Sequence, residues 1–203
     1  MIVKTGSFGS MDNNCYLITD ENTNKSALVD CPEFSEKLAD FIGDAHIEYI
    51  LLTHGHFDHI AGVYDVKEKY NCKVAISKED EPMLSSTKLS LGAFCGVFHK
   101  SVDADLIVAD NDVVNIGDIQ IEVIATPGHT KGSVCYVADD CLFSGDTLFY
   151  LSCGRTDFPG GSVSEMKQSL KNLSLLNGNY KVYSGHGAQS TLDFERQNNP
   201  YMR

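Results

Sequence analysis

The 203-residue chain lacks three features that would each place it in a broad class of proteins. No apolar run approaches the ~20 residues that a membrane-spanning helix needs, so we expect no membrane partner. No cluster of lysine and arginine occurs and the net charge is −12, which argues against a nucleic-acid partner because phosphate binding requires such a cluster. No internal repeat is evident. These absences favour a globular protein that acts on a small molecule, and they do not indicate its oligomeric state.

Paired cysteine motifs and a secretion signal are missing as well. The seven cysteines are odd in number and include no Cys-x-x-Cys pair, so free thiols explain them more simply than a disulfide scaffold. Residues 1–6 show neither the charged nor the apolar region of a secretory signal. We therefore expect a cytoplasmic protein, and the length fits a single domain over residues 1–203.

Strand and helix patterns occupy both halves of the chain. Strands are predicted at residues 2–8, 15–19, 26–30, 48–52, 73–76, 119–125, 133–138, 141–144 and 181–183. Helices are predicted at residues 32–44, 60–70 and 164–176, with a short one at 191–198. Residues 85–104 show no clear period, and we expect an irregular segment or lid near the site. Strand-rich halves with covering helices predict an α/β (α+β) fold in which two sheets pack together with helices outside.

A dense cluster of polar residues follows the strand predicted at 48–52, in the sequence Thr53-His-Gly-His-Phe-Asp-His59. In an extended chain, the side chains of residues i and i+2 point the same way, so His54 and His56 can coordinate one ion. A turn further along would bring Asp58 and His59 toward a neighbouring ion. Neutral imidazole with carboxylate is the ligand set of catalytic zinc and of non-haem iron or manganese.

Three more candidate ligands lie far apart in the sequence, namely His129, Asp146 and His186. Each follows a predicted strand and has glycine beside it, and glycine lets the backbone turn tightly and approach an ion. A single isolated histidine is more often an ordinary core or surface residue. Together with the first cluster, however, five of the seven histidines would serve one site.

These motifs, which run from Asp30 to His186, resemble those of the metallo-β-lactamase superfamily and, within it, the glyoxalase II-like hydrolases. The resemblance implies a four-layer αββα sandwich of two mixed sheets flanked by helices. It implies that one ion is held by His54, His56 and His129, a second by Asp58, His59 and His186, with Asp146 bridging the two. Asp30 matches an acid that orients a ligand. We expect two divalent ions and favour zinc, although the same ligands also bind iron and manganese.

The reaction that fits such a centre is hydrolysis. Two metal ions lower the pKa of bound water toward ~7 and so supply a nucleophile at neutral pH. Asp58 is expected to orient that water or accept its proton. No dedicated general acid is evident, and a thiolate, whose thiol has a pKa of ~8.5, departs with little protonation. We therefore predict hydrolysis of a small thioester, such as an S-acyl (hydroxyacyl) glutathione.

Two further residues allow more than one interpretation. Arg155 lies about where glyoxalase II-like enzymes hold a substrate carboxylate, and an ion pair with Asp157 is nearly as well supported. Cys153 could act as a nucleophile, but His46 and His99, the remaining histidines, are expected to face solvent and would not activate it.

Other members of the superfamily provide the alternatives. Residues 153–161 resemble both glyoxalase II-like proteins and persulfide dioxygenases, which use one iron, whereas the residues around His186 and at 199–201 resemble the hydrolases. Antibiotic-hydrolysing β-lactamases lack the bridging aspartate that Asp146 matches. Flavodiiron oxidoreductases have glutamate at the position that His56 occupies here. A non-enzymatic metal-binding module is disfavoured because seven ligands for two ions leave positions open to water. Longer glyoxalase II enzymes add a C-terminal helical domain that helps to bind glutathione, and this sequence ends at Arg203, so glutathione recognition stays open.

Overall fold

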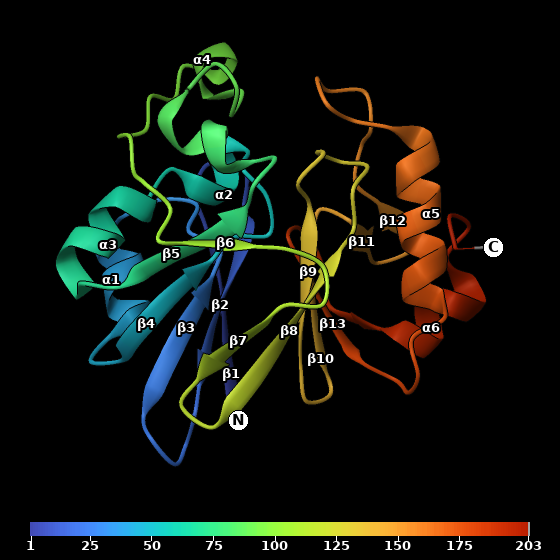
Figure 1. Cartoon of the computed structure of the whole chain (residues 1–203), viewed down its shortest axis with the longest axis horizontal. Helices are drawn as coiled ribbons and strands as arrows, with labels where there is room; N and C mark the ends of the chain where they lie inside the picture. The colour runs from blue at the N-terminus through green and yellow to red at the C-terminus, as the bar shows by residue number, and fades with distance from the viewer. Residues whose placement is uncertain (203) are drawn as a thin grey trace.

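The computed structural model describes residues 1–202. The chain is built around two six-stranded sheets (Figure 1). The first sheet has the order β1-β2-β3-β4-β5-β6, with bounds Ile2–Phe8, Asn13–Thr19, Lys25–Val29, His46–Leu51, Lys73–Ser77 and Leu106–Val108. The second has the order β14-β13-β10-β9-β8-β7, with bounds Ser190–Thr191, Lys181–Ser184, Cys141–Gly145, Val134–Ala138, Ile119–Ala125 and Val113–Ile116. The predicted domain end at Arg203 lies outside the described residues.

Helices cover the outer faces of both sheets. The helices of the first half are α1 Glu36–Ile42, α2 Phe57–Ile60, α3 Val63–Tyr70, the 3-10 turn η1 Glu81–Ser85 and α4 Gly92–Cys95. Those of the second half are α5 Val163–Ser174 and α6 Leu192–Asn198. A small ribbon of β11 Leu148–Phe149 and β12 Ser152–Cys153 lies between the second sheet and α5. Within residues 1–202, no helix is both long and apolar enough to cross a membrane.

Alternation along the strands creates three apolar layers. In β3, Val29 points into a cluster between the sheets, while its neighbour Leu28 joins the cluster beneath α1 and α3. Phe143 of β10 packs between the sheets, and Leu142 faces the other way, toward Leu170 of α5. Three apolar clusters therefore separate four layers, which confirms the αββα sandwich of two mixed sheets.

Strand direction decides where a site can form. Strands β3, β4, β5 and β6 run parallel, and so do β10 and β13. Strand β8 runs in the same direction as β10, because both pair antiparallel with β9. The carboxyl ends of these strands meet at one end of the sandwich, where loops can bring polar side chains together.

Several predicted boundaries need correction. The helix predicted at 32–44 forms only over 36–42, and Ser35 caps it by accepting a hydrogen bond from the Leu38 amide. The helix predicted at 60–70 forms over 63–70 as α3, and residue 60 instead ends the separate short helix α2. Strands β6 and β7, and the short strands β11, β12 and β14, were not predicted. Residues 86–104 contain α4, turns and irregular chain, close to the irregular segment that was expected over 85–104.

Candidate metal centre

All seven predicted ligands lie together at the carboxyl ends of the strands. The loop after β4 and helix α2 carry four of them, and the loops after β8, β10 and β13 carry one each: His54, His56, Asp58 and His59, then His129, Asp146 and His186. They form three overlapping groups in which the candidate ligand atoms lie within 4.8 Å of one another: His54, His56 and His129; His54, His59 and Asp146; and Asp58, His59 and His186. The first and third groups are those that the family resemblance assigns to separate ions.

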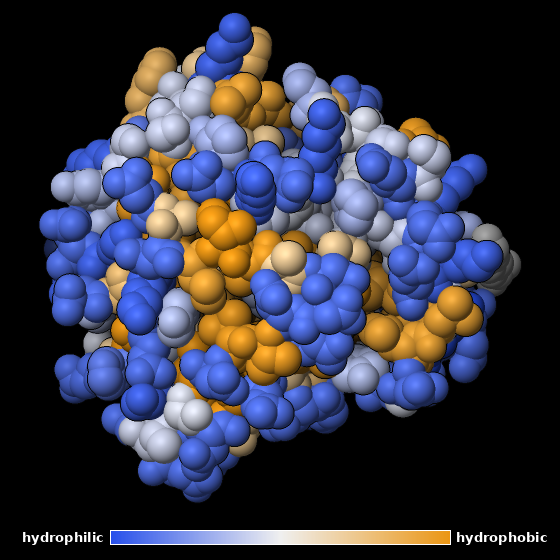
Figure 2. Space-filling model, in the orientation of Figure 1, coloured by the Kyte–Doolittle hydropathy of each residue, from blue (hydrophilic) through white to orange (hydrophobic). Residues whose placement is uncertain are grey.

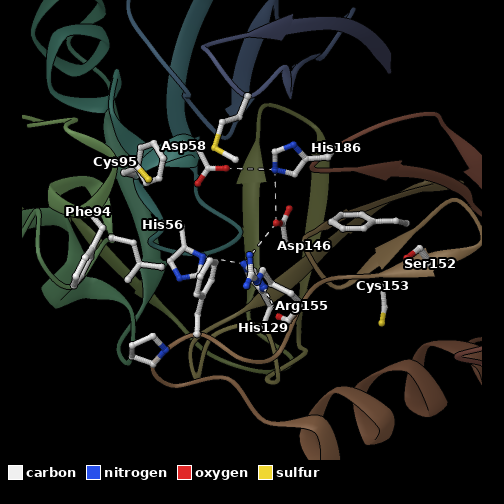
Figure 3. Close-up of a pocket in the computed structure, with 16 residues that line it drawn as sticks. His56, Asp58, Phe94, Cys95, His129, Asp146, Ser152, Cys153, Arg155 and His186 are labelled. Carbon is white, nitrogen blue, oxygen red and sulfur yellow. Dashed lines mark hydrogen bonds and ion pairs between the residues drawn. The ribbon is translucent and has the colours of Figure 1, made fainter.

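A chain of short contacts joins the two sets, as Figure 3 shows. Asp58 Oδ2 lies 3.4 Å from His186 Nε2, which lies 3.7 Å from Asp146 Oδ2. The same Asp146 oxygen is 3.5 Å from His129 Nε2, and His129 Nε2 is 2.8 Å from His56 Nδ1. Asp146 thus contacts His129 of the first group and His186 of the third. A carboxylate that bridges two ions requires this position.

The buried polar atoms of the site fit divalent metal ions. Among the described residues, the Nε2 atoms of His54, His56 and His59 and the Oδ1 atom of Asp146 are buried without a hydrogen-bond partner. Buried polar atoms are nearly always paired, because leaving one unpaired costs about 1–3 kcal/mol. Imidazole nitrogen and carboxylate oxygen are ligands of zinc, iron and manganese. The donor set therefore fits ions that would pair these atoms.

Two of the histidines have the protonation state that metal binding requires. Burial, reinforced by the neighbouring His59, lowers the pKa of His54 well below its usual value. Burial and the nearby His129 lower the pKa of His56 to about 3. Both rings are therefore neutral at pH 7, and a neutral imidazole offers a lone pair to a metal ion.

Asp30 holds His59 in place from behind. Its Oδ2 atom lies 2.8 Å from His59 Nδ1 and accepts a hydrogen bond of 2.9 Å from the Thr53 hydroxyl, and its Oδ1 atom accepts one of 2.9 Å from the Thr53 amide. This leaves His59 Nε2 directed at Asp146 Oδ1, 3.3 Å away. Burial lowers the pKa of His59, but the carboxylates of Asp30 and Asp146 outweigh burial and raise it. The geometry is that of an acid that orients a ligand.

Asn13 positions Asp58, and sequence reasoning missed it. Its Nδ2 atom donates to Asp58 Oδ2 over 3.0 Å and lies 3.2 Å from His186 Nε2. Burial raises the pKa of the Asp58 carboxyl, but the charge of His59 and the hydrogen bonds from His186 and Asn13 bring it below its usual value. Asp58 is therefore a carboxylate at neutral pH, and its second oxygen is free of the Asn13 contact.

Asp80, which follows β5, is a second residue that sequence reasoning missed. It is fully buried and accepts from the Gly55 amide over 2.9 Å, the Thr130 hydroxyl over 2.7 Å and the Gly132 amide over 3.0 Å. It therefore ties the loop that carries His54 and His56 to the loop that carries His129. Its one signal in the sequence is its place after a predicted strand.

Glycine is required at two ligand loops. Gly145 precedes Asp146 at a φ of 47°, and a Cβ there would overlap the Thr53 side chain. A Cβ on Gly185 would overlap Asp146 Oδ1 and crowd His59. Both positions agree with the expectation that glycine lets the backbone come close to the ligands.

A cavity of about 730 Å³ opens above the ligands. Its wall includes Arg155, whose Nε and Nη2 atoms donate to the two carboxylate oxygens of Asp157, each over 2.6 Å. Arg155 therefore makes the ion pair that the sequence offered as an alternative to substrate binding, and its contact with a substrate stays a prediction. Cys153 also lines the cavity, and burial raises its thiol pKa, so the thiol is not activated as a nucleophile.

The two remaining histidines differ in exposure. His46 is exposed, as expected. His99 is half-buried, with Nε2 2.9 Å from the Ser90 hydroxyl, so it faces solvent only in part. Neither residue lines the cavity.

Comparison with known proteins places this centre in a family. The model of the metallo-beta-lactamase superfamily matches residues 9–186. A hydroxyacylglutathione hydrolase from Rhodopseudomonas palustris (strain HaA2) is 37% identical over 178 residues, which are 86% of this chain and 62% of that protein. The chain thus spans less than two thirds of the length of this relative.

Solved structures with the same fold extend over nearly the whole chain. The B3 metallo-beta-lactamase BLEG-1 is 30% identical, with a TM-score of 0.93 over 99% of each chain. TTHA1623, solved in a di-iron-bound form, is 29% identical, with a TM-score of 0.86 over 98% of this chain and 100% of that one. ETHE1 from Myxococcus xanthus is 28% identical, with a TM-score of 0.80 over 98% of this chain and 84% of that one. On the sequence match and the shared αββα fold, the chain belongs to the metallo-β-lactamase superfamily.

Proposed function

We propose that the protein is a dinuclear metal-dependent hydrolase that cleaves a small thioester. Members of the superfamily are generally metal-dependent hydrolases, and the hydroxyacylglutathione hydrolase relative is 37% identical to this chain. The small-molecule substrate and the cytoplasmic location that the sequence predicts belong to this proposal. The single observation that carries it is the buried Asp146 carboxylate, which contacts His129 of one ligand group and His59 of the other.

The chemistry of the site divides between the ions and the side chains. Bound zinc ions, or iron in their place, would supply a water of lowered pKa and a Lewis acid for the substrate carbonyl. Asp58 would orient the attacking water through the oxygen that Asn13 leaves free, and it would accept the proton because it is ionised at neutral pH. His59 and His129 keep fixed orientations through their far ring nitrogens, which contact Asp30 and the Arg155 carbonyl.

Metal content and turnover test the proposal together. We expect about two ions per chain in the purified protein, and a clear loss of metal in Asp146→Asn, since this change weakens a ligand shared by both groups. Asp140→Asn is the matched control, because Asp140 is an exposed aspartate paired with Lys181. The zinc-loaded protein should release thiol from an acyl thioester. Zinc-loaded protein with two ions and no thioester turnover would contradict the proposal.

Persulfide oxidation is the second candidate, favoured by the similarity to ETHE1 from Myxococcus xanthus. The discriminating measurement is oxygen uptake by the iron-loaded protein with glutathione persulfide, set beside thiol release by the zinc-loaded protein. Oxygen consumption without thioester hydrolysis would reverse the order of the two candidates. One ion per chain, with unchanged content in His56→Ala, would point the same way.

The similarity to BLEG-1 requires one further assay. Asp146 led us to predict that the chain does not hydrolyse antibiotics, and that remains a prediction. A chromogenic cephalosporin offered to the zinc-loaded protein tests it. Turnover of the β-lactam faster than that of the thioester would overturn the proposed substrate class.

A further inference from the structure

The walls of the cavity above the ligands are apolar on two sides. One wall comes from α4 and its entry, with Leu91 and Phe94, and the other comes from the ribbon and the loop after it, with Phe149 and Phe158. In Figure 3, Phe94 lies on one side of Asp146, and Ser152 and Cys153 of the ribbon lie on the other. Segments far apart in the sequence therefore enclose one apolar space.

These walls reach the ligands themselves. The ring of Phe158 meets that of His56 edge-on, with 5.7 Å between centroids, and Phe149 meets His186 in the same way at 6.1 Å. A group bound between the walls would therefore lie beside the atoms where the reaction is proposed to occur.

Positive charge is scarce around the cavity. Apart from the ligand histidines, Arg155 is the one cationic side chain among the described residues that line it. Its guanidinium is already engaged by both oxygens of Asp157 and lies over the Phe158 ring, 3.9 Å from the centroid. A substrate carboxylate could not use this Nε–Nη2 pair without displacing Asp157, which leaves it only the outer N–H groups of Nη1 and Nη2. The cavity is poorly suited to glutathione, which carries two carboxylates.

We propose that the substrate is a thioester whose organic group next to the reacting bond is uncharged and apolar, of aryl or medium-chain alkyl size. This inference rests on the proposed hydrolase function and specifies its substrate class. An apolar group between Phe94 and Phe158 leaves water on binding, and that transfer supplies the affinity. The cavity volume is in the range of pockets that enclose small organic molecules.

The α4 segment exposes apolar side chains, and of these Phe94 faces the cavity. Phe94 is 76% exposed although it lines the cavity, and Leu89 and Phe98 of the same segment are 50% and 75% exposed. Figure 2 shows apolar atoms at the end of the molecule where α4 lies. Phe94 is therefore the residue whose burial on substrate binding would change most.

Hydrolysis of a thioester series tests the substrate class. Acetyl, butyryl, hexanoyl and benzoyl thioesters of N-acetylcysteamine, a neutral thiol, are compared with the same acyl groups on glutathione, and thiol release gives kcat/KM. We expect kcat/KM to rise about fourfold for each methylene that reaches the walls, the equivalent of burying one CH₂. We expect the neutral thiol to exceed glutathione by about tenfold. A second series varies the alkyl group on the thiol side and keeps the acyl group constant. Comparison of the two series shows whether the acyl part or the thiol part of the substrate lies between the apolar walls.

Two phenylalanine variants separate the cavity from the surface. Phe94→Ala should lower kcat/KM for the hexanoyl thioester about tenfold and leave the acetyl thioester unchanged. Phe98→Ala is the matched control, because Phe98 is as exposed but does not line the cavity. Arg155→Ala should change kcat/KM for the glutathione and the N-acetylcysteamine thioesters of the same acyl group by the same factor, because Arg155 packs on Phe158 and makes no special contact with a carboxylate. Loss confined to the glutathione thioester in this variant would restore the carboxylate-binding role of Arg155 and overturn the inference.

Calorimetry gives a readout that does not depend on turnover. The S-hexyl thioether of N-acetylcysteamine should bind about tenfold more tightly than S-methylglutathione, and Phe94→Ala should remove the difference. Equal binding, or tighter binding of S-methylglutathione, would overturn the inference while leaving the hydrolase proposal intact. Preference for the hexyl compound without thioester turnover would instead remove the hydrolase proposal and retain the apolar ligand class.

Discussion

Asp30 has a backbone φ of 58°, a left-handed conformation that an aspartate adopts far less readily than glycine. The conformation places the carboxylate between Thr53 and His59, where it makes three short contacts. Such strained residues persist where the surrounding structure holds them, and they concentrate at functional sites. We infer that the orientation of His59 depends on this one residue.

Asp30→Asn tests that dependence. An amide in place of the carboxylate removes the negative charge opposite His59 Nδ1, so the ring loses its fixed orientation. We expect metal affinity to fall about 10–100-fold, as is usual when the partner of a ligating histidine is changed. Competition with a chromogenic zinc chelator measures it, with Asp140→Asn as the exposed control. Unchanged affinity in Asp30→Asn would mean that Thr53 and packing alone hold the ring.

Asp80 illustrates why part of the site escaped prediction. The seven ligands stand out in the sequence because chemically distinctive residues occur together or beside glycine. Asp80 stands in a charged run, Lys78 to Glu81, of the kind that usually faces solvent. Its partners are mostly backbone amides from distant loops, which only the folded chain brings together. Asn13 was missed because its partners, Asp58 and His186, are also distant in the sequence and meet it only in the folded chain.

Asp80→Ala should be costly to the fold. The change leaves the amides of Gly55 and Gly132 and the Thr130 hydroxyl without an acceptor, and each unpaired buried donor costs about 1–3 kcal/mol. We expect a loss of at least about 3 kcal/mol in the free energy of unfolding, a fall of about 6–12 °C in Tm. Thermal melting followed by circular dichroism measures it. Asp80→Asn keeps one acceptor oxygen, so its Tm should lie between those of the wild type and of Asp80→Ala. A wild-type Tm in Asp80→Ala would contradict the proposed role of Asp80 in joining the two ligand loops.

At the scale of elements, long periodic segments were predicted well and short ones were not. The main strands and α5 fall within a few residues of their predicted positions. The helix predicted from residue 32 begins at 36 because the backbone at Cys31 is used elsewhere: its amide donates to the His59 carbonyl, and its carbonyl accepts from the Gly62 amide. Strands β6 and β7 are three and four residues long, too short for alternation to identify them.

The turn that ends β10 carries a further prediction. Gly145→Ala places a Cβ at positive φ, which costs about 1–2 kcal/mol, and the Cβ also overlaps Thr53, the partner of Asp30. We expect both a lower Tm and a loss of bound metal, measured by melting and elemental analysis. Gly178→Ala is the control, since Gly178 has a φ of 94° and open space around its Cβ position. It should lower the Tm and keep the metal, whereas full metal content in Gly145→Ala would contradict the prediction.

At the scale of the whole molecule, the two sheets contribute ligands separately. His54 to His59 come from the end of the first sheet, and His129, Asp146 and His186 from the end of the second. Ions held between them would link the two halves at the open end of the sandwich. The sequence could predict the members of this centre, and the fold itself was needed to show that the two halves share it.

Chelation should therefore destabilise the molecule. A ligand present at 100 times its Kd stabilises the native state by about 2.7 kcal/mol. For a chain of this size, that corresponds to a fall of about 5–10 °C in Tm when the metal is removed. Scanning calorimetry before and after treatment with a chelator measures it, and zinc added back should restore the original value. A Tm that chelation does not change would show that no metal links the two sheets.

Asp30 and Asp80 hold the loops that bear the ligands, and the α4 segment contacts the first of these loops through the hydrogen bond that the Phe57 amide donates to the Ser90 carbonyl over 2.9 Å. The ligands and the α4 wall therefore come from different segments of the chain that share a backbone contact. We expect an exchange of residues 86–100 for the equivalent stretch of a relative to change the apolar wall and to leave the metal content unchanged, as long as the hydrogen bond between Phe57 and residue 90 is kept.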